Sequence, residues 1–250
     1  LKYPKVCTDT RNIQPNCIFF ALKGQNFNGN KFASEAIRNG ASYAIVDEEK
    51  YMSGEAFVLV EDVLKTLQLL ANFHRNYCKA KIIGLTGSNG KTTTKELIYA
   101  VLSKKYNTIA TKGNLNNHIG VPLTLLTIKA DTEFAIIEMG ANHVKEIEFL
   151  CNIAEPDFGY ITNFGKAHLE GFGGVEGVIK GKSELYDHLI ANKKFIFLNA
   201  DDAIQLKKLS NYPSKFGFSS SDHNYFRINY LGAHPFVKLE SEKTEINTQL

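Results

Sequence analysis

The chain has 250 residues, of which 44% are hydrophobic and 22% are charged. These proportions are typical of a globular protein, and the length is sufficient for two domains. The formal net charge is only +3 and no basic block occurs, so nucleic-acid binding is not expected. No segment resembles a signal peptide and no apolar run reaches the length of a membrane span. The sequence therefore predicts a cytoplasmic protein without membrane contact.

The chain contains four cysteines, which lie far apart and form no C-x-x-C pair. This spacing is typical of free thiols in a reducing compartment and agrees with a cytoplasmic location. We expect the protein to act as a monomer. The cysteines are Cys7, Cys17, Cys78 and Cys151.

The first part of the chain, residues 1–80, is predicted to be a small α/β domain. Gly40 is a suitable residue after a helix end, and Asp62 is a suitable N-cap for a second helix. The boundary to the next domain is expected at residues 79–81. The expected strands are Cys17–Leu22, Ser42–Val46 and Phe57–Val60, and the expected helices are Lys31–Asn39 and Asp62–Tyr77.

The second part, residues 81–250, alternates strand and helix patterns, which predicts a doubly wound parallel sheet. Several of the strand patterns are continuously apolar, as expected for parallel strands that are covered on both faces. The expected strands are Ile82–Thr86, Thr108–Ala110, Phe134–Met139, Phe158–Thr162, Phe195–Asn199 and Lys215–Phe218. The expected helices are Thr92–Lys105, His118–Leu126, Val144–Asn152, Val175–Ile190 and Ala203–Leu209. Antiparallel edge strands are expected at Tyr225–Tyr230, Phe236–Leu239 and Glu245–Leu250.

The most informative segment is Ile82–Leu97, which reads IIGLTGSNGKTTTKEL. An apolar strand pattern leads into a glycine-rich turn and then into a helix pattern, the order of a nucleotide-binding phosphate loop. Glycines let backbone N–H groups approach a polyanion, while Lys91 and Thr92 would contact the β/γ-phosphates and Mg²⁺. The general pattern requires glycine where this chain has Leu85. The alternative is a glycine-rich turn with a chance Gly-Lys-Thr.

Three residues outside the loop are candidates for a metal and phosphate site. Glu138 ends an apolar strand pattern, where a carboxylate can hold Mg²⁺, and the alternative is a surface glutamate at a strand end. His168 lies in a glycine-rich loop after a predicted strand, although a single loop histidine is more often solvated or a cap. Lys182 lies in a helix pattern, and the residues alone predict an exposed lysine there.

Several long motifs resemble the Mur ligases. The run GLTGSNGKTTTKE has the spacing of the phosphate loop of that family, so Leu85 agrees with this resemblance. The N-terminal triplet at positions 28–30 is Asn-Gly-Asn, where members often have Asp-Gly-His. The other matching segments are Asp9–Arg11, Cys17–Gly24, Gly113–Leu126, Glu138–Leu150, Asn163–Gly174 and Asn199–Asp202.

The resemblance implies a role for each matching residue. ATP would be held by Thr86, Gly87, Ser88, Asn89, Gly90, Lys91, Thr92 and Thr93, with Asn199 and Asp201 on the adenosine side. Substrate contacts would come from Thr10, Arg11, Lys23, Gly24, Asn28, Gly29, Asn116 and Asn117. Two Mg²⁺ ions are implied, one held by Thr92 and Glu138 and one by Glu138, His168 and carbamylated Lys182, with Lys180 as the competing lysine. The implied catalytic residues are Lys91, Lys182, His168 and Asn117.

The implied activity is ATP-dependent amide ligation in peptidoglycan precursor synthesis. The motifs are most similar to those of members that join D-alanyl-D-alanine to a UDP-N-acetylmuramoyl tripeptide. In that reaction the peptide carboxylate takes the γ-phosphoryl group of ATP, and the dipeptide amine then displaces phosphate. The alternatives are members that add the third residue, a phosphate-loop NTPase or kinase that forms no amide, and a fragment that only binds the UDP-sugar.

The chain stops at Leu250 without a turn or cap signal. Members of the family have a third, C-terminal domain, so the resemblance implies that this domain is absent from the chain. We therefore expect little ligase activity and at best weak ATP binding from these 250 residues alone.

Overall fold

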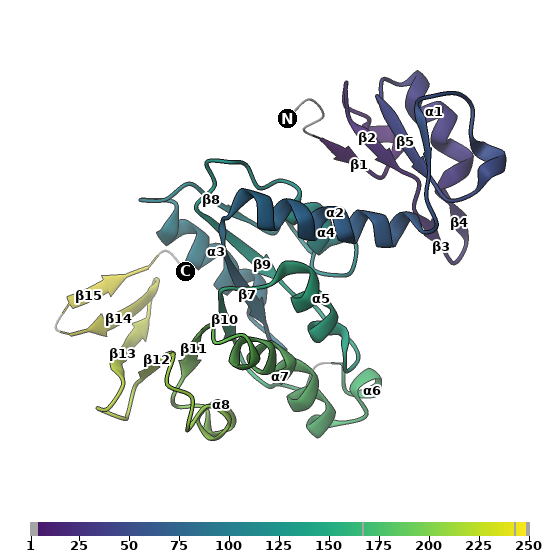
Figure 1. Cartoon of the computed structure of the whole chain (residues 1–250). Coiled ribbons are helices and arrows are strands. Elements are labelled where there is room, and N and C mark those ends of the chain that lie inside the picture. The colour runs from purple at the N-terminus through teal and green to yellow at the C-terminus, as the bar shows by residue number, and fades with distance from the viewer. Residues whose placement is uncertain (1–4, 167, 243, 249–250) are drawn as a thin grey trace.

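The computed structural model describes residues 5–166, 168–242 and 244–248. These residues form a four-stranded sheet, a nine-stranded sheet and a separate two-stranded hairpin. A long helix, α2 (Val63–Cys78), runs from the smaller sheet to the helices Gly120–Leu125 and Glu146–Ala154 that cover the larger one (Figure 1). Within the described ranges, no helix is long and apolar enough to cross a bilayer.

The smaller sheet is parallel, in the order β1-β2-β5-β6. Alternate residues of its second strand pack on opposite faces, since Phe19 joins the cluster beside the first helix and Phe20 packs against α2. Both faces are covered, which explains the continuous apolar run in the sequence. The elements are β1 (Val6–Cys7), β2 (Ile18–Phe20), β5 (Tyr43–Val46), β6 (Phe57–Leu59) and α1 (Ala33–Arg38).

The sequence patterns missed the shortest elements of this region. A hairpin pairs β3 (Lys23–Gly24) with β4 (Phe27–Asn28), and 3-10 turns occupy Thr10–Asn12, Gly29–Phe32 and Glu49–Tyr51. A two-residue strand has no periodicity to detect, and the first turn of the expected Lys31 helix is 3-10 rather than α.

Helix α2 begins where the sequence predicted it. The Asp62 carboxylate accepts a hydrogen bond from the backbone N–H of Lys65 at 2.8 Å. The helix buries Val63, Leu67, Ala71 and Arg75, which are spaced four residues apart and therefore share one face.

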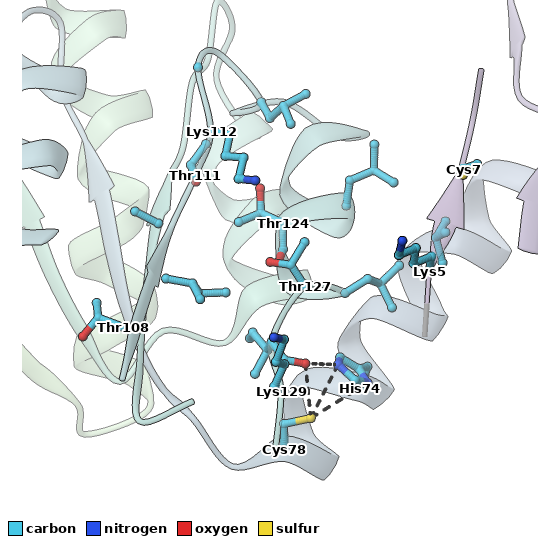
Figure 2. Close-up of a pocket in the computed structure, with 18 of the residues that line it drawn as sticks. Lys5, Cys7, His74, Cys78, Thr108, Thr111, Lys112, Thr124, Thr127 and Lys129 are labelled. Atoms are coloured by element: carbon cyan, nitrogen blue, oxygen red, sulfur yellow. Dashed lines mark hydrogen bonds between the residues drawn. The ribbon is translucent and has the colours of Figure 1, made fainter. Parts of the chain in front are cut away.

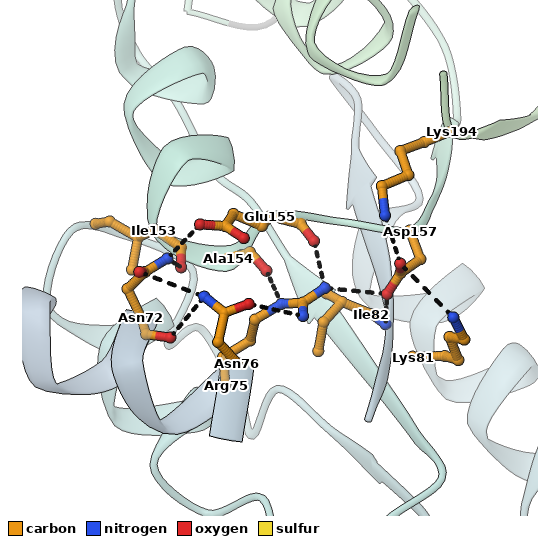
Figure 3. A network of polar contacts seen from close by, with 10 residues as sticks. All are labelled: Asn72, Arg75, Asn76, Lys81, Ile82, Ile153, Ala154, Glu155, Asp157 and Lys194. Atoms are coloured by element: carbon orange, nitrogen blue, oxygen red, sulfur yellow. Dashed lines mark hydrogen bonds and ion pairs between the residues drawn. The ribbon is translucent and has the colours of Figure 1, made fainter. Parts of the chain in front are cut away.

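Arg75 fastens α2 to the larger sheet. Its Nε donates to the carbonyl of Ala154 at 2.9 Å, and its Nη2 donates to the carboxylate of Asp157 at 3.0 Å. The same carboxylate accepts from Lys194 Nζ at 2.8 Å (Figure 3). The carbonyls of Ala154 and Glu155 lie at the carboxyl end of helix α5 (Glu146–Ala154), where a guanidinium is favourable because these groups carry partial negative charge.

The larger sheet has the order β15-β14-β13-β12-β11-β10-β7-β9-β8. The strands from β8 to β13 are parallel, and β13, β14 and β15 pair antiparallel. The predicted doubly wound class and antiparallel edge are thus confirmed. The strands are β7 (Lys81–Thr86), β8 (Thr108–Ala110), β9 (Phe134–Glu138), β10 (Phe158–Ile161), β11 (Phe195–Asn199), β12 (Lys215–Ser219), β13 (Phe226–Ala233), β14 (Val237–Ser241) and β15 (Thr244–Asn247). The end of the last expected strand, residues 249–250, lies outside the described residues.

Helices connect these strands and cover the sheet. Helix α3 contacts β7, β8 and β9, while α4, α5 and α7 pack on one another and on neighbouring strands. The short α6 was not predicted. The helices are α3 (Lys91–Leu102), α4 (Gly120–Leu125), α5 (Glu146–Ala154), α6 (Leu169–Phe172), α7 (Val175–Ala191) and α8 (Ala203–Lys208).

One part of the sheet departs from the expectation of two covered faces. A row of aromatic side chains crosses β10, β11 and β12, and Phe216 is 45% exposed. The alternate residues Ile161, Ile196 and Leu198 are fully buried. A continuous apolar strand pattern therefore did not distinguish a fully covered face from an aromatic face that is partly open.

Strand β7 lies between β9 and β10, so the chain connections leave it in opposite directions. In a parallel sheet this switch point opens a crevice at the carboxyl ends of the strands. The glycine-rich segment after β7 lies at this edge, together with Glu138 at the end of β9.

Candidate functional site

The glycine-rich loop spans residues 87–90, between the end of β7 and the start of α3. The predicted order of strand, loop and helix is therefore present. Gly87 has φ +145° and Gly90 has φ +75°, both in the range that favours glycine. The loop brings the amino end of α3, with its unpaired backbone N–H groups, to the carboxyl edge of the sheet.

The loop after β10 holds the glycine-rich loop in place. The Ser88 backbone N–H donates to the carbonyl of Asn163 at 3.1 Å, and Thr162 Oγ1 donates to the carbonyl of Asn89 at 2.6 Å. A Cβ on Gly87 would lie 1.9 Å from Thr162 Oγ1. The two loops thus approach as closely as only glycine permits.

Replacing Gly87 by alanine is expected to lower the free energy of unfolding by about 2 kcal/mol or more, because the new methyl group combines a strained φ with a steric collision. Gly24→Ala is a matched control, since its Cβ would meet nothing within 4 Å. Chemical denaturation of both variants checks this. Equal stability of Gly87→Ala and the parent chain would contradict the described loop contact.

Lys91 lies across the loop rather than away from it. Its Nζ donates to the carbonyls of Gly87 at 2.8 Å and Ser88 at 3.3 Å. Burial lowers the pKa of Lys91, and the nearby Glu138 charge acts in the opposite direction. The ammonium is therefore held at the loop, where an anion cradled by the backbone would meet it.

Glu138 is a buried carboxylate beside this loop, with an exposed fraction of only 1%. Its Oε2 accepts from Thr92 Oγ1 at 3.2 Å, and its Oε1 accepts from Asn116 Nδ2 at 2.8 Å. The structure thus brings together the predicted residues Thr92, Glu138 and Asn116. A surface position for Glu138, the alternative reading of the sequence, is wrong.

A further charge in this cluster was missed by the sequence patterns. Lys95 Nζ lies 4.0 Å from Glu138 Oε2, and the lysine side chain is completely buried. The available signal was its position four residues after Lys91, which places both lysines on one face of α3.

Lys182 is buried in α7, with an exposed fraction of 1%, so the prediction of an exposed helical lysine is wrong. Its Nζ donates to the carbonyl of Ala141 at 3.0 Å and lies 5.1 Å from the centre of the Phe172 ring. Burial, and secondarily the charge of Lys91, lower the pKa of Lys182 to about 8. An amine with this pKa is partly uncharged near neutral pH and can act as a nucleophile.

His168 precedes α6 and is exposed, with φ +57°. Its carbonyl accepts from the N–H of Phe172, the residue whose ring lies against Lys182. Across the described ranges, no group of three His, Cys, Asp or Glu side chains is close enough to hold a metal ion. A role for His168 as a metal ligand therefore stays a prediction.

Several other predicted residues form local hydrogen bonds. Thr86 Oγ1 donates to the carbonyl of Met139 at 2.8 Å, which joins β7 to the end of β9. Asn117 Oδ1 accepts from the N–H of Gly120 at 2.9 Å and so closes the turn before α4. Ser88 is buried, whereas Asn89 and Thr93 are exposed. The nucleotide contacts expected for the loop residues and the substrate contact expected for Asn117 stay predictions.

The predicted adenosine side lies between β11 and β12. Asn199 Oδ1 accepts from the N–H of Asp201 at 3.0 Å. The Asp201 carboxylate accepts from the hydroxyls of Ser219, Ser220 and Ser221. These hydrogen bonds, led by that from Ser219, hold the pKa of Asp201 well below its usual range. The loop is therefore preformed, and its contact with adenosine stays a prediction.

The N-terminal candidates lie at two places, one near Asp9 and one near Asp47. Near Asp9, Arg11 follows Thr10, pairs with the Asp9 carboxylate at 2.6 Å and is 86% exposed. Lys23, next to Gly24, pairs with Asp47 at 3.1 Å.

The other candidates surround buried Asn30, the last residue of the Asn-Gly-Asn triplet, which was not among the expected substrate contacts. Asn30 Nδ2 donates to Asp47 Oδ1 at 2.8 Å and to Asn28 Oδ1 at 3.0 Å. A Cβ on Gly29 would lie 2.5 Å from the carbonyl oxygen of Leu22. Asn30 thus organises the segment that holds Asn28 and Gly29.

A cleft of about 1170 Å³ separates β1 from the edge strand β8 (Figure 2). Lys5, Lys112 and Lys129 line it, together with Thr124 and Thr127. The cleft borders the residues next to Asp9 on one side and Leu115, the neighbour of Asn116, on the other. Most of its lining is apolar, and its three lysines outnumber its one carboxylate, that of Glu96, so the cleft suits a ligand with apolar and anionic parts.

Comparison with protein families gives two matches. The family described as Mur ligase middle domain matches residues 85–250, and the one described as Mur ligase family, catalytic domain, matches residues 2–82.

Three of the similar curated proteins share the name UDP-N-acetylmuramoyl-tripeptide–D-alanyl-D-alanine ligase. That of Bacillus subtilis (strain 168) is 39% identical over 202 residues, which cover 80% of this chain and 44% of the relative. That of Escherichia coli (strain K12) is 41% identical over 197 residues, which cover 79% of this chain and 43% of the relative. That of Haemophilus influenzae is 35% identical over 253 residues, which cover 98% of this chain and 55% of the relative. The chain thus spans about half the length of these relatives.

Solved structures are similar in fold over nearly the whole chain. MurF from Acinetobacter baumannii has a TM-score of 0.83 at 32% identity, covering 97% of this chain and 54% of that one. MurF ligase from Thermotoga maritima in complex with ADP has a TM-score of 0.83 at 30% identity, covering 97% and 57%.

Proposed function

Because the chain belongs to the Mur ligase family, we propose that it forms the UDP-sugar-binding and ATP-binding part of an amide ligase. In this proposal residues 1–80 hold the UDP-sugar and residues 81–250 hold ATP. The reaction joins D-alanyl-D-alanine to a UDP-N-acetylmuramoyl tripeptide, in the cytoplasm, with the protein as a monomer. The observation that carries the proposal is the hydrogen bond from the exposed Thr92 hydroxyl to the buried Glu138 carboxylate, 3.2 Å long and beside the glycine-rich loop.

The geometry of this loop supports ATP as the nucleotide. Backbone N–H groups at the start of α3 and the ammonium of Lys91 present positive charge at one place. The Mur ligase structure from Thermotoga maritima holds ADP, as its name states.

Mg²⁺ fits the donor set at this edge, because it prefers oxygen ligands, and Glu138 and Thr92 present a carboxylate and a hydroxyl group. A carbamate on Lys182 would add further oxygen atoms, and we propose it with His168 and Glu138 for a second ion. When bound, Mg²⁺ would neutralise charge on the phosphates during transfer.

The proposed reaction has two steps. The tripeptide carboxylate oxygen attacks the γ-phosphorus of ATP, and ADP leaves with the electrons of the broken bond. The dipeptide amine then attacks the acyl carbon, phosphate departs, and the amine loses a proton. The chain's own contribution is to orient the reactants: Lys91 holds the phosphates, Asn116 fixes Glu138, and the basic cleft receives the UDP-linked substrate.

Calorimetry on the 250-residue chain tests the proposal with separate ligands. We expect binding of a non-hydrolysable ATP analogue with Mg²⁺, and separate binding of UDP-N-acetylmuramoyl tripeptide. Binding of the nucleotide alone would favour a phosphate-loop NTPase, and binding of the UDP-sugar alone would favour a non-catalytic fragment. Calorimetric comparison of UDP-N-acetylmuramoyl tripeptide with UDP-N-acetylmuramoyl dipeptide separates the two ligase activities, because each activity expects tighter binding of its own UDP-linked substrate.

Lys182 should react with carbon dioxide in a pH-dependent manner. Because its pKa is lowered to about 8, the uncharged amine becomes more abundant as the pH rises through that value. At constant dissolved carbon dioxide, the carbamate signal should increase between about pH 7 and about pH 9. NMR with isotope-labelled carbon dioxide measures it, with Lys180→Arg as the control and Lys182→Arg as the variant that lacks the signal. A signal that persists in Lys182→Arg would assign the carbamate to another lysine.

A further inference from the structure

Lys95 is a buried cation that the proposed reaction leaves without a role. Its side chain has no exposed surface, and its Nζ has no hydrogen-bond partner among the residues that the structure describes. The nearest charges are Glu96 Oε1 at 3.0 Å, in an ion pair without hydrogen-bond geometry, and Glu138 Oε2 at 4.0 Å. Glu96 compensates this charge only in part, because its side chain is 60% exposed and makes no hydrogen bond with Nζ. Burial of the ammonium is therefore unfavourable, and an apolar residue would serve the packing of α3 better.

The position of Lys95 relates it to the phosphate loop. It follows Lys91 by four residues and Thr92 by three, and these spacings place all three on one face of α3. Glu138 Oε2 accepts from Thr92 and also faces Lys95, whereas Oε1 is occupied by Asn116. One carboxylate oxygen is thus shared between the loop hydroxyl and the buried ammonium.

A divalent cation that bound Glu138 would meet this fixed positive charge. Two cations on one buried carboxylate repel each other, and the protein interior screens the repulsion only weakly. A bound triphosphate makes the electrostatic energy favourable, since its negative charges attract both the Mg²⁺ ion and the lysine. Lys95 therefore weakens the binding of free Mg²⁺ and strengthens the binding of an anionic nucleotide.

We infer that the fixed positive charge of Lys95 weakens the binding of free Mg²⁺ to Glu138, so that this carboxylate binds Mg²⁺ mainly together with a nucleotide. This inference rests on the proposed nucleotide site and adds a specificity-determining residue to it. Lys95 acts through Glu138 and through the charge of the loop, so it is a positioning residue.

The test replaces Lys95 by methionine and measures two affinities at one pH. We expect the affinity for free Mg²⁺, added as magnesium chloride without nucleotide, to rise about tenfold, and that for an ATP analogue in EDTA to fall about tenfold. Calorimetry or the ligand-induced shift in melting temperature gives both values. Opposite shifts are diagnostic, because a merely damaged fold would weaken both ligands.

Three further variants make the result specific. Lys104→Met removes one charge from an exposed lysine just beyond α3 and should change either affinity less than about twofold. Adding Glu138→Gln to Lys95→Met should abolish the gain in Mg²⁺ affinity. Lys95→Gln, with a polar tip, provides the same comparison if the methionine variant does not fold.

The outcomes are distinct. Nucleotide binding by the parent chain, with Mg²⁺ affinity unchanged or reduced in Lys95→Met and Lys95→Gln, overturns the inference and leaves the proposed function standing. Failure of the parent chain to bind any nucleotide, with or without Mg²⁺, overturns the proposed function and this inference with it.

Discussion

Replacing Lys91 by methionine is expected to lower the affinity for an ATP analogue about 100-fold, a loss of charge-assisted hydrogen bonds that corresponds to about 2.7 kcal/mol. The reason is the place of its ammonium, which lies over the carbonyls of Gly87 and Ser88 rather than in solvent. A triphosphate bound in the loop would accept hydrogen bonds from this ammonium in place of the two carbonyls. Titration of nucleotide in the presence of Mg²⁺ measures the effect.

The control for this prediction is Lys91→Arg, which keeps the charge but changes the shape of the donor. We expect an intermediate loss, because the loop geometry suits a compact point charge. The melting temperature without ligand should change little in both variants, since Lys91 is only half-buried. Nucleotide affinity in Lys91→Met within about threefold of the parent value would show that the phosphates bind elsewhere.

The sequence predicted this loop well because its information is local. Strand β7, the turn and α3 are consecutive, and glycine and lysine have specific physical roles at fixed spacings. The same holds for the doubly wound class of the sheet, which alternating strand and helix patterns indicate, although they did not give the order of its strands. Elements of two residues, such as β1 and β3, carry no comparable signal.

The surroundings of the candidate site depend on contacts between distant segments, which periodicity does not report. Lys182 occupies a helical position that reads as exposed, yet α6 folds over it and its amine meets the carbonyl of Ala141. Lys95 and Glu138 come together from α3 and β9, which are separate in the chain. The long motifs of the family resemblance, rather than composition or spacing, predicted the importance of Lys182.

The contact between α2 and the larger sheet is another long-range feature, and it leads to the largest expected effect on stability. Arg75 is 8% exposed, and its guanidinium donates to the carbonyls of Ala154 and Glu155 and to the carboxylate of Asp157 (Figure 3). In Arg75→Met these buried acceptors lose their donor, because the methionine side chain has none to offer. We expect a loss of about 3 kcal/mol or more in the free energy of unfolding.

A loss of this size should lower the melting temperature by about 6–12 °C. The matched control is Lys194→Met, which removes a partner of the same Asp157 carboxylate from a side chain that is 38% exposed. Because solvent already screens that pair, its removal should cost less than about 1 kcal/mol. Thermal and urea denaturation of the two variants measure how much stability is lost with the buried donor Arg75 and with the more exposed donor Lys194, which share the acceptor Asp157. If Lys194→Met proved as destabilising as Arg75→Met, the stability would come from the net charge around Asp157 rather than from the buried hydrogen bonds that fasten α2.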